Sequence, residues 1–432
     1  MPDDRPRIHW ISPLPPAETD IAHYTRRILP ELAERADLTL WTDAESWDAG
    51  LDAICPVRHL NPQRIVPGQM RPNGARGDRP GTVFINIGNA WCFHAGLLAL
   101  ARRMPSVIVL HDLAVQEMFC DAVRNGLLAR EDYLASMQHW YGEEGRNAAQ
   151  EVLEGRQSVV DLGQRFPGFE LTMENAAAVL THTQAAAQAV AARGFLPAYR
   201  LDLPFRATGP ACSGRAMQGP LRLVQFGHIG PNRCLEQVLE ALAGMGPGFD
   251  FVLDIVGKLW NPELIEARCS ELGIDGKVRR HGYVPEAELD ALLGRAHLVF
   301  NLRHPTMGEA SGSQLRIWNA AAASVVTDQG WYHHLPEGTV FRVPVEEDVA
   351  ALRALLERLD KDRTIGQSLG AAGYARLVEC HGPAEYADGI AEVARAFESD
   401  TRDAVLARAA RRLLSRGAED TGLVRRRLAR FF

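Results

Sequence analysis

The stretch from residue 301 to 319, NLRHPTMGEASGSQLRIWN, carries the residues best suited to chemistry. It continues an apolar run, residues 296–302, that is typical of a buried strand. A lone carboxylate, Glu309, is then followed by Ser311-Gly312-Ser313, which would begin a helix. Backbone N–H groups at a helix start can hold an oxyanion or a sugar hydroxyl, and a carboxylate can accept hydrogen bonds from a polyol. The stretch therefore predicts a ligand that is part phosphate and part sugar.

A second candidate is the loop GHIGPNR, which runs from Gly227 to Arg233 and includes His228 and Asn232. A strand precedes this loop and a helix follows it. Glycines allow a close approach to a ligand, and a helix N-terminus favours anions. Arg233 would add a fixed cation for a diphosphate. An ordinary strand-to-helix turn is the alternative interpretation.

Two further segments end strands of the first half of the chain. His111-Asp112 follows SVIVL and would point into a cleft, although this histidine could instead cap the next helix. Residues 12–19, SPLPPAET, stand where a dinucleotide-binding fold carries G-x-G-x-x-G, so a nicotinamide enzyme is not expected. Asp360-Lys361-Asp362 follows a helical pattern and not a strand, and the adjacent His333 and His334 would seldom face one ion. We therefore predict no metal site.

Short apolar strands alternate with amphipathic helical stretches through most of the sequence. Strands joined by helical crossovers predict parallel, doubly wound α/β sheets, and two sets of them predict two Rossmann-like domains facing a cleft. The predicted strands are Arg7–Ser12, Leu38–Thr42, Thr82–Gly88, Ser106–His111, Ala178–Thr183, Leu221–Gly227, Asp250–Gly257, Val278–Tyr283, Ala296–Leu302, Ser324–Asp328 and Thr339–Val343.

The pattern of strands and breakers also predicts domain limits. An N-terminal domain is expected over residues 1–205, with a helical insertion at about 113–174 that either serves as scaffold or binds an acceptor. A Pro- and Gly-rich linker over 206–220 would lead to a C-terminal domain over 221–382. C-terminal helices with a basic tail would complete the chain over 383–432.

Composition excludes several classes of protein. The chain has 432 residues, 46% of them hydrophobic, and a net charge of −7, which argues against general nucleic-acid binding. Seven cysteines without a C-x-x-C pair indicate reduced thiols, and no apolar run is long enough for a signal peptide or a membrane span. We expect a cytoplasmic protein. The tail, 401–432, has nine arginines against three acids and could contact the inner face of the membrane, or could pack on the protein itself.

Taken together, these segments resemble glycosyltransferase family 4, retaining enzymes with the GT-B fold. The resemblance covers most of the chain and rests on the order and spacing of several motifs. They are SPLPP with DIAHYTRRILPELA, IVLHD, FGHIGPNRCLEQVLEAL, FVLDIVGK, GYVPEAELDALLGRAHLVFNLR, PTMGEASG and VVTDQGWYHHLP.

The resemblance implies roles for individual residues. The family's basic residue that neutralises the donor diphosphate corresponds to Arg233. Its histidine near the donor sugar corresponds to His111, and its sugar-binding glutamate corresponds to Glu309. The family often has a second basic residue where this chain has His228, and it usually has a ribose-binding glutamate where this chain has Ile317. The chain departs from the family pattern at both places. The implied donor-binding set is Gly227, His228, Asn232, Arg233, Glu309, Ser311, Gly312 and Ser313.

The implied activity is a metal-independent hexosyl transfer from a nucleoside-diphosphate sugar to an acceptor hydroxyl, without a cofactor. The acceptor would be a glycan, a lipid-linked molecule or a small molecule, as in bacterial glycan or glycoconjugate biosynthesis. Three alternatives share this fold. They are a non-catalytic subunit that binds sugar nucleotide and supports a partner, a nucleotide-sugar epimerase, and a phosphorylase-like enzyme that would need a lysine for pyridoxal phosphate.

Overall fold

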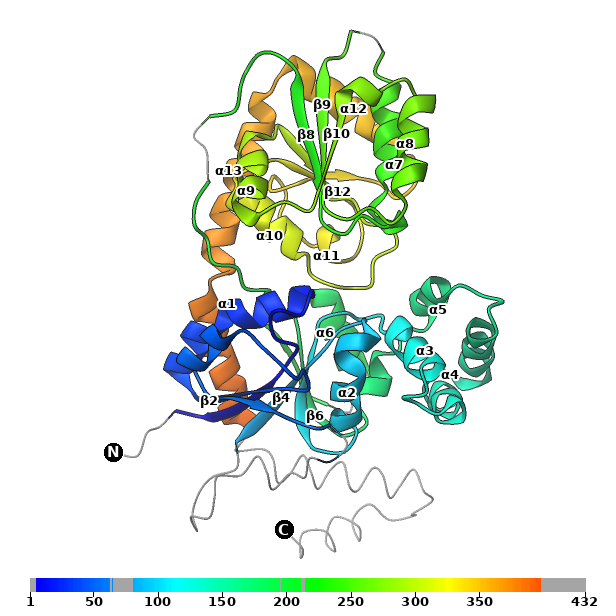
Figure 1. Cartoon of the computed structure of the whole chain (residues 1–432), viewed down its shortest axis with the longest axis vertical. Coiled ribbons are helices and arrows are strands. Elements are labelled where there is room, and N and C mark those ends of the chain that lie inside the picture. The colour runs from blue at the N-terminus through cyan, green and yellow to red at the C-terminus, as the bar shows by residue number, and fades with distance from the viewer. Residues whose placement is uncertain are drawn as a thin grey trace, which may run out of the picture. The chain divides into compact units, whose positions relative to one another are not determined.

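The structure is a computed structural model that describes residues 5–62, 64, 81–194, 196–210, 214–246 and 248–397. The chain divides into two compact α/β units (Figure 1). The first comprises Met1–Pro204 with Pro383–Phe432, and the second comprises Phe205–Gly382. The basic tail at 401–432, together with the membrane contact predicted for it, lies outside the described residues.

The first unit is built on a seven-stranded parallel sheet with the order β3-β2-β1-β4-β5-β6-β7. Helices cover both faces, so successive residues of a central strand enter different cores: Ile8 and Trp10 join one cluster, and Ile11 joins another. The strands are β1 (Arg7–Ile11), β2 (Asp37–Thr42), β3 (Val57–His59), β4 (Thr82–Ile87), β5 (Ser106–Leu110), β6 (Ala176–Thr181) and β7 (Ala198–Arg200).

The helices of the first unit come from both ends of the chain (Figure 1). Residues 383–397 are helical and return to the first unit, where Ala387, Ile390 and Ala394 are buried in the same cluster as Trp10. The other helices are α1 (Asp20–Arg35), η1 (Ala49–Ala53), α2 (Trp91–Ala101), α3 (Gln116–Arg124), α4 (Arg130–Leu153), α5 (Val159–Arg165), η3 (Phe169–Thr172) and α6 (Gln184–Ala192).

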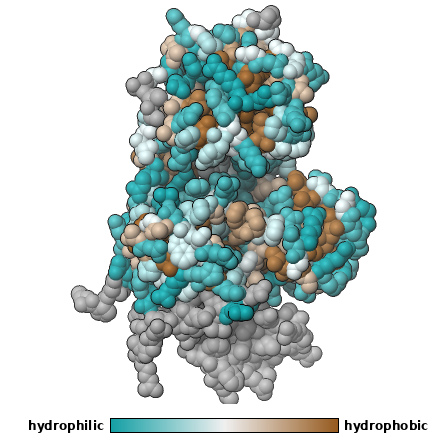
Figure 2. All heavy atoms as spheres, in the orientation of Figure 1, coloured by the Kyte–Doolittle hydropathy of each residue, from teal (hydrophilic) through white to brown (hydrophobic). Residues whose placement is uncertain are grey.

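The segment between β5 and β6 is helical and consists of α3, α4, α5 and η3. A buried carboxylate, Glu170, ties α4 to the rest of the unit, because it accepts a hydrogen bond from the Tyr141 hydroxyl and pairs with Arg193. Hydrophobic side chains gather on the surface of this segment (Figure 2), and Leu127 is 57% exposed there.

The second unit has a six-stranded parallel sheet with the order β10-β9-β8-β11-β12-β13. Its strands are β8 (Leu221–Phe226), β9 (Phe251–Val256), β10 (Val278–Gly282), β11 (Leu298–Phe300), β12 (Ser324–Thr327) and β13 (Phe341–Val343). Its helices are η4 (Pro231–Arg233), α7 (Leu235–Ala243), α8 (Pro262–Glu271), η5 (Asp275–Lys277), α9 (Glu286–Arg295), α10 (Gly312–Asn319), α11 (Gly330–His333), α12 (Asp348–Lys361) and α13 (Thr364–Cys380).

The predicted fold class, two Rossmann-like α/β units with parallel sheets, is confirmed, and every predicted strand is present. The sequence analysis missed β3 and β7. Both are three-residue edge strands, VRH and AYR, with no fully buried residue. Strands this short and this exposed lack the apolar run by which a buried parallel strand is recognised. Among the described residues, no helix combines the length and the apolar character that a bilayer crossing requires.

The carboxyl ends of β8 and β9 approach each other closely at two glycines. The Gly227 N–H donates to the Val256 carbonyl at 2.9 Å, and a Cβ added at Gly257 would lie 2.2 Å from the Gly227 carbonyl oxygen. Gly257 also has φ +111°, in the region that favours glycine. This close packing sets the path of the loop that begins at Gly227.

We predict that Gly257→Ala lowers the free energy of unfolding by about 2–4 kcal/mol, because both the backbone angle and the Gly227 carbonyl oppose a side chain. Urea unfolding would measure the change. Gly276→Ala is the matched control, since an added Cβ there meets nothing within 4 Å, and it should change stability by about 0.5 kcal/mol or less. Equal effects of the two substitutions would contradict the prediction.

Candidate functional site

The loop after β8 brings Arg233 to the carboxyl edge of the second sheet. The amides of Gly227 and Ile229 donate to carbonyls of the β9 end, Val256 and Lys258, at 2.9 and 2.8 Å, so these two donors are occupied. The loop then forms η4 and holds Arg233 through a hydrogen bond from the Gln225 side-chain amide to the Arg233 carbonyl at 2.9 Å. The side chain of His228, the neighbour of Gly227, is exposed.

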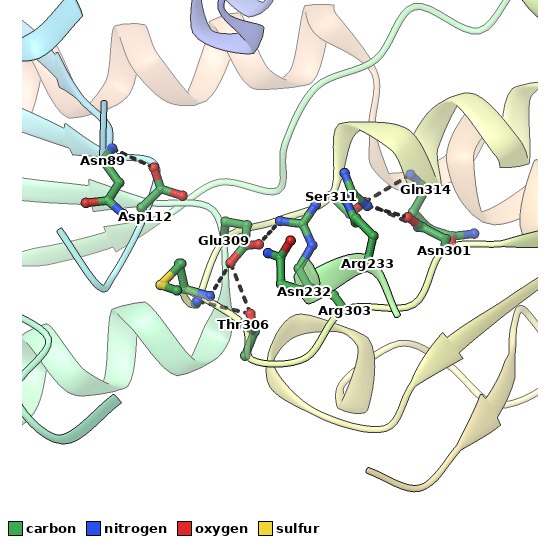
Figure 3. Close-up of polar contacts among 12 residues, drawn as sticks. Asn89, Asp112, Asn232, Arg233, Asn301, Arg303, Thr306, Glu309, Ser311 and Gln314 are labelled. Carbon is green, nitrogen blue, oxygen red and sulfur yellow. Dashed lines mark hydrogen bonds and ion pairs between the residues drawn. The ribbon is translucent and has the colours of Figure 1, made fainter. Parts of the chain in front are cut away.

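Asn301 joins this loop to the start of α10 (Figure 3). Its Oδ1 accepts a hydrogen bond from Nη1 of Arg233 at 3.2 Å, while its Nδ2 lies 3.3 Å from Ser311 Oγ and 3.0 Å from Gln314 Oε1. Gln314 in turn donates to the Ser324 hydroxyl at 2.8 Å. Asn301 is only 3% exposed, and Gln314 and Ser324 are fully buried. Buried polar groups that satisfy one another in this way hold the arginine and the helix start in one fixed arrangement.

The N-terminus of α10 offers unoccupied backbone donors. Ser311 caps the helix by accepting the Gln314 N–H at 3.1 Å. The N–H groups of Gly312 and Ser313 have no acceptor among the described residues, as expected in the first turn of a helix. A Cβ added at Gly312 would meet nothing within 4 Å, so the backbone there is open to a ligand. These donors, with Arg233 beside them, suit an anion.

Glu309 lies in the loop between β11 and α10, where its own loop surrounds it (Figure 3). One carboxylate oxygen accepts the Thr306 hydroxyl at 3.0 Å and the Met307 N–H at 2.7 Å. The other oxygen pairs with Nη1 of Arg303. The side chains of Glu309 and Arg303 are 11% and 16% exposed. Glu309 is therefore positioned beside the α10 start as predicted, but its carboxylate is already engaged by a cation that the sequence analysis did not single out.

Ile317, at the place of the family's ribose-binding glutamate, is a core residue. It is fully buried on α10 in a cluster with Val224, Phe226 and Val299. A carboxylate at this position would lie among apolar side chains, so a ribose contact cannot come from this side chain.

His111 lies in the first unit, directly after β5, in a cluster of aromatic rings. Its ring centroid is 4.8 Å from that of Tyr24 and 4.9 Å from that of His182. Tyr24 and Tyr386 share a hydrogen bond of 2.5 Å between their hydroxyls. Asp112, the next residue, accepts the Asn89 N–H at 2.9 Å. His111 therefore does not cap the following helix: α3 begins after Val115, and the Met118 N–H of its first turn donates to Oδ1 of Asn89 at 3.2 Å.

The hydrogen bonds define the tautomers of these imidazoles. Asn86 Nδ2 donates to the Ile11 carbonyl at 3.0 Å, so its Oδ1 is the acceptor for Nε2–H of His111 at 2.9 Å. His182 Nδ1 lies 3.1 Å from the Leu201 carbonyl and must donate to it. Burial lowers the pKa of His182 to about 4, and burial, with the neighbouring imidazoles adding to it, lowers the pKa of His111 well below its ordinary value. Both rings are neutral near pH 7, and Nδ1 of His111 can accept a hydrogen bond.

In the two segments where metal ligands were not expected, 360–362 and 333–334, side chains make local structural contacts. Asp362 Oδ1 accepts the Thr364 N–H at 2.9 Å at the start of α13, and His333 Nδ1 lies 3.0 Å from Asp328. Within the described part of the chain, no group of three or more histidine, cysteine, aspartate or glutamate side chains could hold a metal ion.

The second unit thus brings together most of the predicted donor-binding set, namely Gly227, Asn232, Arg233, Glu309, Ser311, Gly312 and Ser313, at the ends of β8 and β11. His228 lies in the same loop, and His111 belongs to the first unit. Sequence reasoning assigned no role to Asn301, Gln314 and Arg303, although all three lie in the stretch 301–319 that it selected. One signal was available, because Asn301 is a polar residue at the end of the apolar run LVF.

Comparison with known proteins supports this description of the second unit. Residues 232–392 match the model of a family described as glycosyl transferase-like. None of the curated proteins matches the chain.

Solved structures with the same fold cover nearly the whole chain. HepE of Anabaena, crystallised with UDP, has a TM-score of 0.57 and 15% identity, and the match covers 90% of this chain and 99% of HepE. Sucrose-phosphate synthase of Thermosynechococcus elongatus has a TM-score of 0.59 and 15% identity, with 91% and 100% covered. WaaG, a glycosyltransferase involved in lipopolysaccharide biosynthesis, has a TM-score of 0.54 and 14% identity, with 90% and 99% covered. The architecture is that of GT-B glycosyltransferases, and the family match supports a place in the glycosyltransferase superfamily.

The buried imidazoles predict a pH dependence of stability. His94 and His182 have folded pKa values of about 4, below the ordinary 6.5, because of burial, so the unfolded chain binds protons first as the pH falls. The free energy of unfolding should therefore decrease from about pH 6.5 towards pH 4, by up to roughly 3 kcal/mol for each imidazole. His182→Asn keeps a donor for the Leu201 carbonyl and cannot be protonated, so its stability should fall less between pH 7 and pH 5 than that of the unaltered protein. Urea unfolding at both pH values would measure this, and equal losses would contradict it.

Proposed function

We propose that this protein is a retaining glycosyltransferase that moves a sugar from a nucleoside-diphosphate sugar to an acceptor hydroxyl, in the synthesis of a glycan or glycoconjugate. The observation that carries the proposal is the buried bridge from Arg233 through Asn301 to Ser311. It fixes a cation beside the open N–H groups of Gly312 and Ser313, and a diphosphate is a ligand that uses both. The glycosyl transferase-like match over residues 232–392 includes all of these residues.

The proposed chemistry depends on charge that develops on the leaving group. Breaking the bond between the sugar and the diphosphate puts negative charge on the diphosphate and positive charge on the sugar carbon. Arg233 and the N–H groups of Gly312 and Ser313 would stabilise the leaving group without rearranging, because the Asn301 bridge already holds them. These donors allow us to propose a metal-independent reaction, in which the leaving phosphate helps to take the acceptor proton and the configuration is retained.

His111 and Glu309 are the proposed contacts of the sugar. A neutral imidazole whose Nε2–H is given to Asn86 presents Nδ1 as an acceptor for a sugar hydroxyl. Ribose recognition must use other groups, because Ile317 is buried in an apolar cluster. That burial also motivates the second candidate function, a subunit that binds sugar nucleotide without turning it over.

The experiment that tests the proposal combines ligand binding with turnover. HepE was crystallised with UDP and with UDP-glucose, so UDP, GDP, ADP and their glucose conjugates are suitable first probes for thermal-shift screening of the purified chain. If the protein is a transferase, a nucleoside diphosphate should raise its melting temperature, and the protein should transfer sugar from the donor to an acceptor. Binding without turnover would favour the non-catalytic subunit, and donor conversion without an acceptor would favour an epimerase. Absence of any nucleotide-dependent shift would refute the proposal.

We predict that Arg233→Gln weakens binding of the nucleoside diphosphate that the protein prefers by about 10- to 100-fold, because a charged hydrogen-bond donor is lost. It should also lower kcat by about two to three orders of magnitude, since Arg233 acts on charge that grows in the transition state. Isothermal titration calorimetry and a transfer assay would measure the two effects.

Arg280→Gln is the control for this prediction. Arg280 has a side chain that is 39% exposed and pairs with Glu266 at 3.0 Å, and it lies on β10, which β9 separates from β8. It should bind and turn over donor like the unaltered protein. Normal transfer by the Arg233 variant would remove Arg233 from the mechanism.

A further inference from the structure

We propose that Arg303 is a second cation for the donor diphosphate, and that Glu309 is the carboxylate that occupies Arg303 until the donor binds. The inference rests on the function proposed above and gives a role to a residue to which the sequence analysis assigned none. The first observation is that the loop after β8 has little positive charge for a diphosphate. The loop after β8 has an exposed His228 where the resemblance implies a second basic residue. Arg233 is therefore the only charged side chain that this loop offers a diphosphate.

Arg303 stands next to the loop that carries Arg233. Strand β11 pairs with β8 in parallel, so the chain leaves both strands at the same edge of the sheet. The two loops are then joined directly, because the His304 N–H donates to the Asn232 carbonyl at 2.8 Å. Figure 3 shows the side chains of Arg233 and Arg303 in the same group with Asn232 and Glu309. The two guanidinium groups therefore belong to one site.

The backbone of Arg303 is held at both of its polar groups. Its N–H donates to the Thr327 hydroxyl at 3.0 Å, and its carbonyl accepts a hydrogen bond from the side-chain amide of Gln329. The side chain is 16% exposed. Because the backbone is fixed, a ligand that binds here changes the partner of the guanidinium and not the course of the loop.

The guanidinium of Arg303 is only partly satisfied. Its Nη1 pairs with Glu309, but its Nε is buried and has no hydrogen-bond acceptor among the described residues. A buried donor without a partner costs about 1–3 kcal/mol. Phosphate oxygens match the fork of an arginine and can take two of its donors at once. A diphosphate that draws the guanidinium away from Glu309 could accept the Nε–H as well, which has no partner in the arrangement with Glu309.

Glu309 behaves as a resident counter-ion. The carboxylate keeps the Thr306 hydroxyl and the Met307 N–H on one oxygen and gives the other to Arg303. When phosphate oxygens take over Arg303, that second oxygen becomes available for a sugar hydroxyl. Binding of the diphosphate would thus free Glu309 for the sugar contact proposed for it. A diphosphate without a sugar offers the carboxylate no new partner, so Glu309 would compete with it for Arg303.

The test uses the full-length protein and calorimetric titration with UDP, GDP and ADP, each compared with its nucleoside. Arg303→Gln should weaken binding of the preferred diphosphate by about 10- to 100-fold and leave binding of the nucleoside unchanged. Glu309→Gln should strengthen binding of the same diphosphate by about 3- to 10-fold, because a competing charge is removed, while it lowers the rate of sugar transfer.

Arg316→Gln is the matched control. Arg316 is 15% exposed and pairs with Asp290 at 2.8 Å and with Glu286 at 3.2 Å on the side of α10 that faces α9. It should bind the diphosphate like the unaltered protein. Arg303→Lys provides a second variant that retains the charge; it should keep a preference for the diphosphate over the nucleoside but lose part of the affinity.

The outcomes separate this inference from the function on which it rests. If the unaltered protein binds none of the three diphosphates, both fail. If it binds one of them and the Arg303 variants bind it equally well, only the role of Arg303 fails. If Glu309→Gln weakens diphosphate binding as much as Arg303→Gln does, Glu309 serves to shape the loop and is not a counter-ion that the donor displaces.

Discussion

The amide of Asn301 is the group on which the candidate site depends. A primary amide offers an acceptor and a donor on the same rigid plane, and here the acceptor takes Arg233 while the donor is shared by Ser311 and Gln314. The residue stands one position beyond β11, so the central strand of the sheet determines where the amide lies. A buried polar network of this kind is stable only when all of its members are satisfied. The arginine and the helix start therefore keep their positions through the sheet core, and not through the loops that expose them.

Much of the fold follows from local sequence patterns. Runs such as TVFINI and FVLDIV are mostly apolar, which is typical of parallel strands covered on both faces, and the structure has β4 and β9 there. The start of α10 is also visible in the sequence, because Ser311 precedes a helix-forming stretch and caps it. The edge strands β3 and β7 could not be recognised, since three mostly exposed residues carry no periodic signal.

The chemistry of the site was less accessible to the sequence analysis than its position. Glu309 was selected because of its spacing from the glycine and serine turn, but spacing cannot reveal that Arg303, six residues earlier, folds back onto it. Nor could it show that Val256 and Lys258 already occupy the amides of Gly227 and Ile229. Such partners depend on how loops from different strands meet, and that is a property of the assembled sheet. By contrast, the departure at Ile317 was visible in the sequence, and its burial with Val224 and Phe226 gives the reason an apolar residue fits.

The helix at residues 383–397 has a consequence for the order in which the chain can fold. Tyr386, Ala387, Ile390, Val393 and Ala394 are part of the same hydrophobic cluster as Ile8, Trp10 and Leu29, and the Tyr386 hydroxyl bonds to that of Tyr24. A ribosome synthesises residues 5–204 long before it reaches this helix. The first unit therefore keeps part of its apolar surface uncovered until residues 383–397 have been synthesised. The second unit, residues 205–382, contains its whole sheet in one continuous segment and can fold as soon as it emerges.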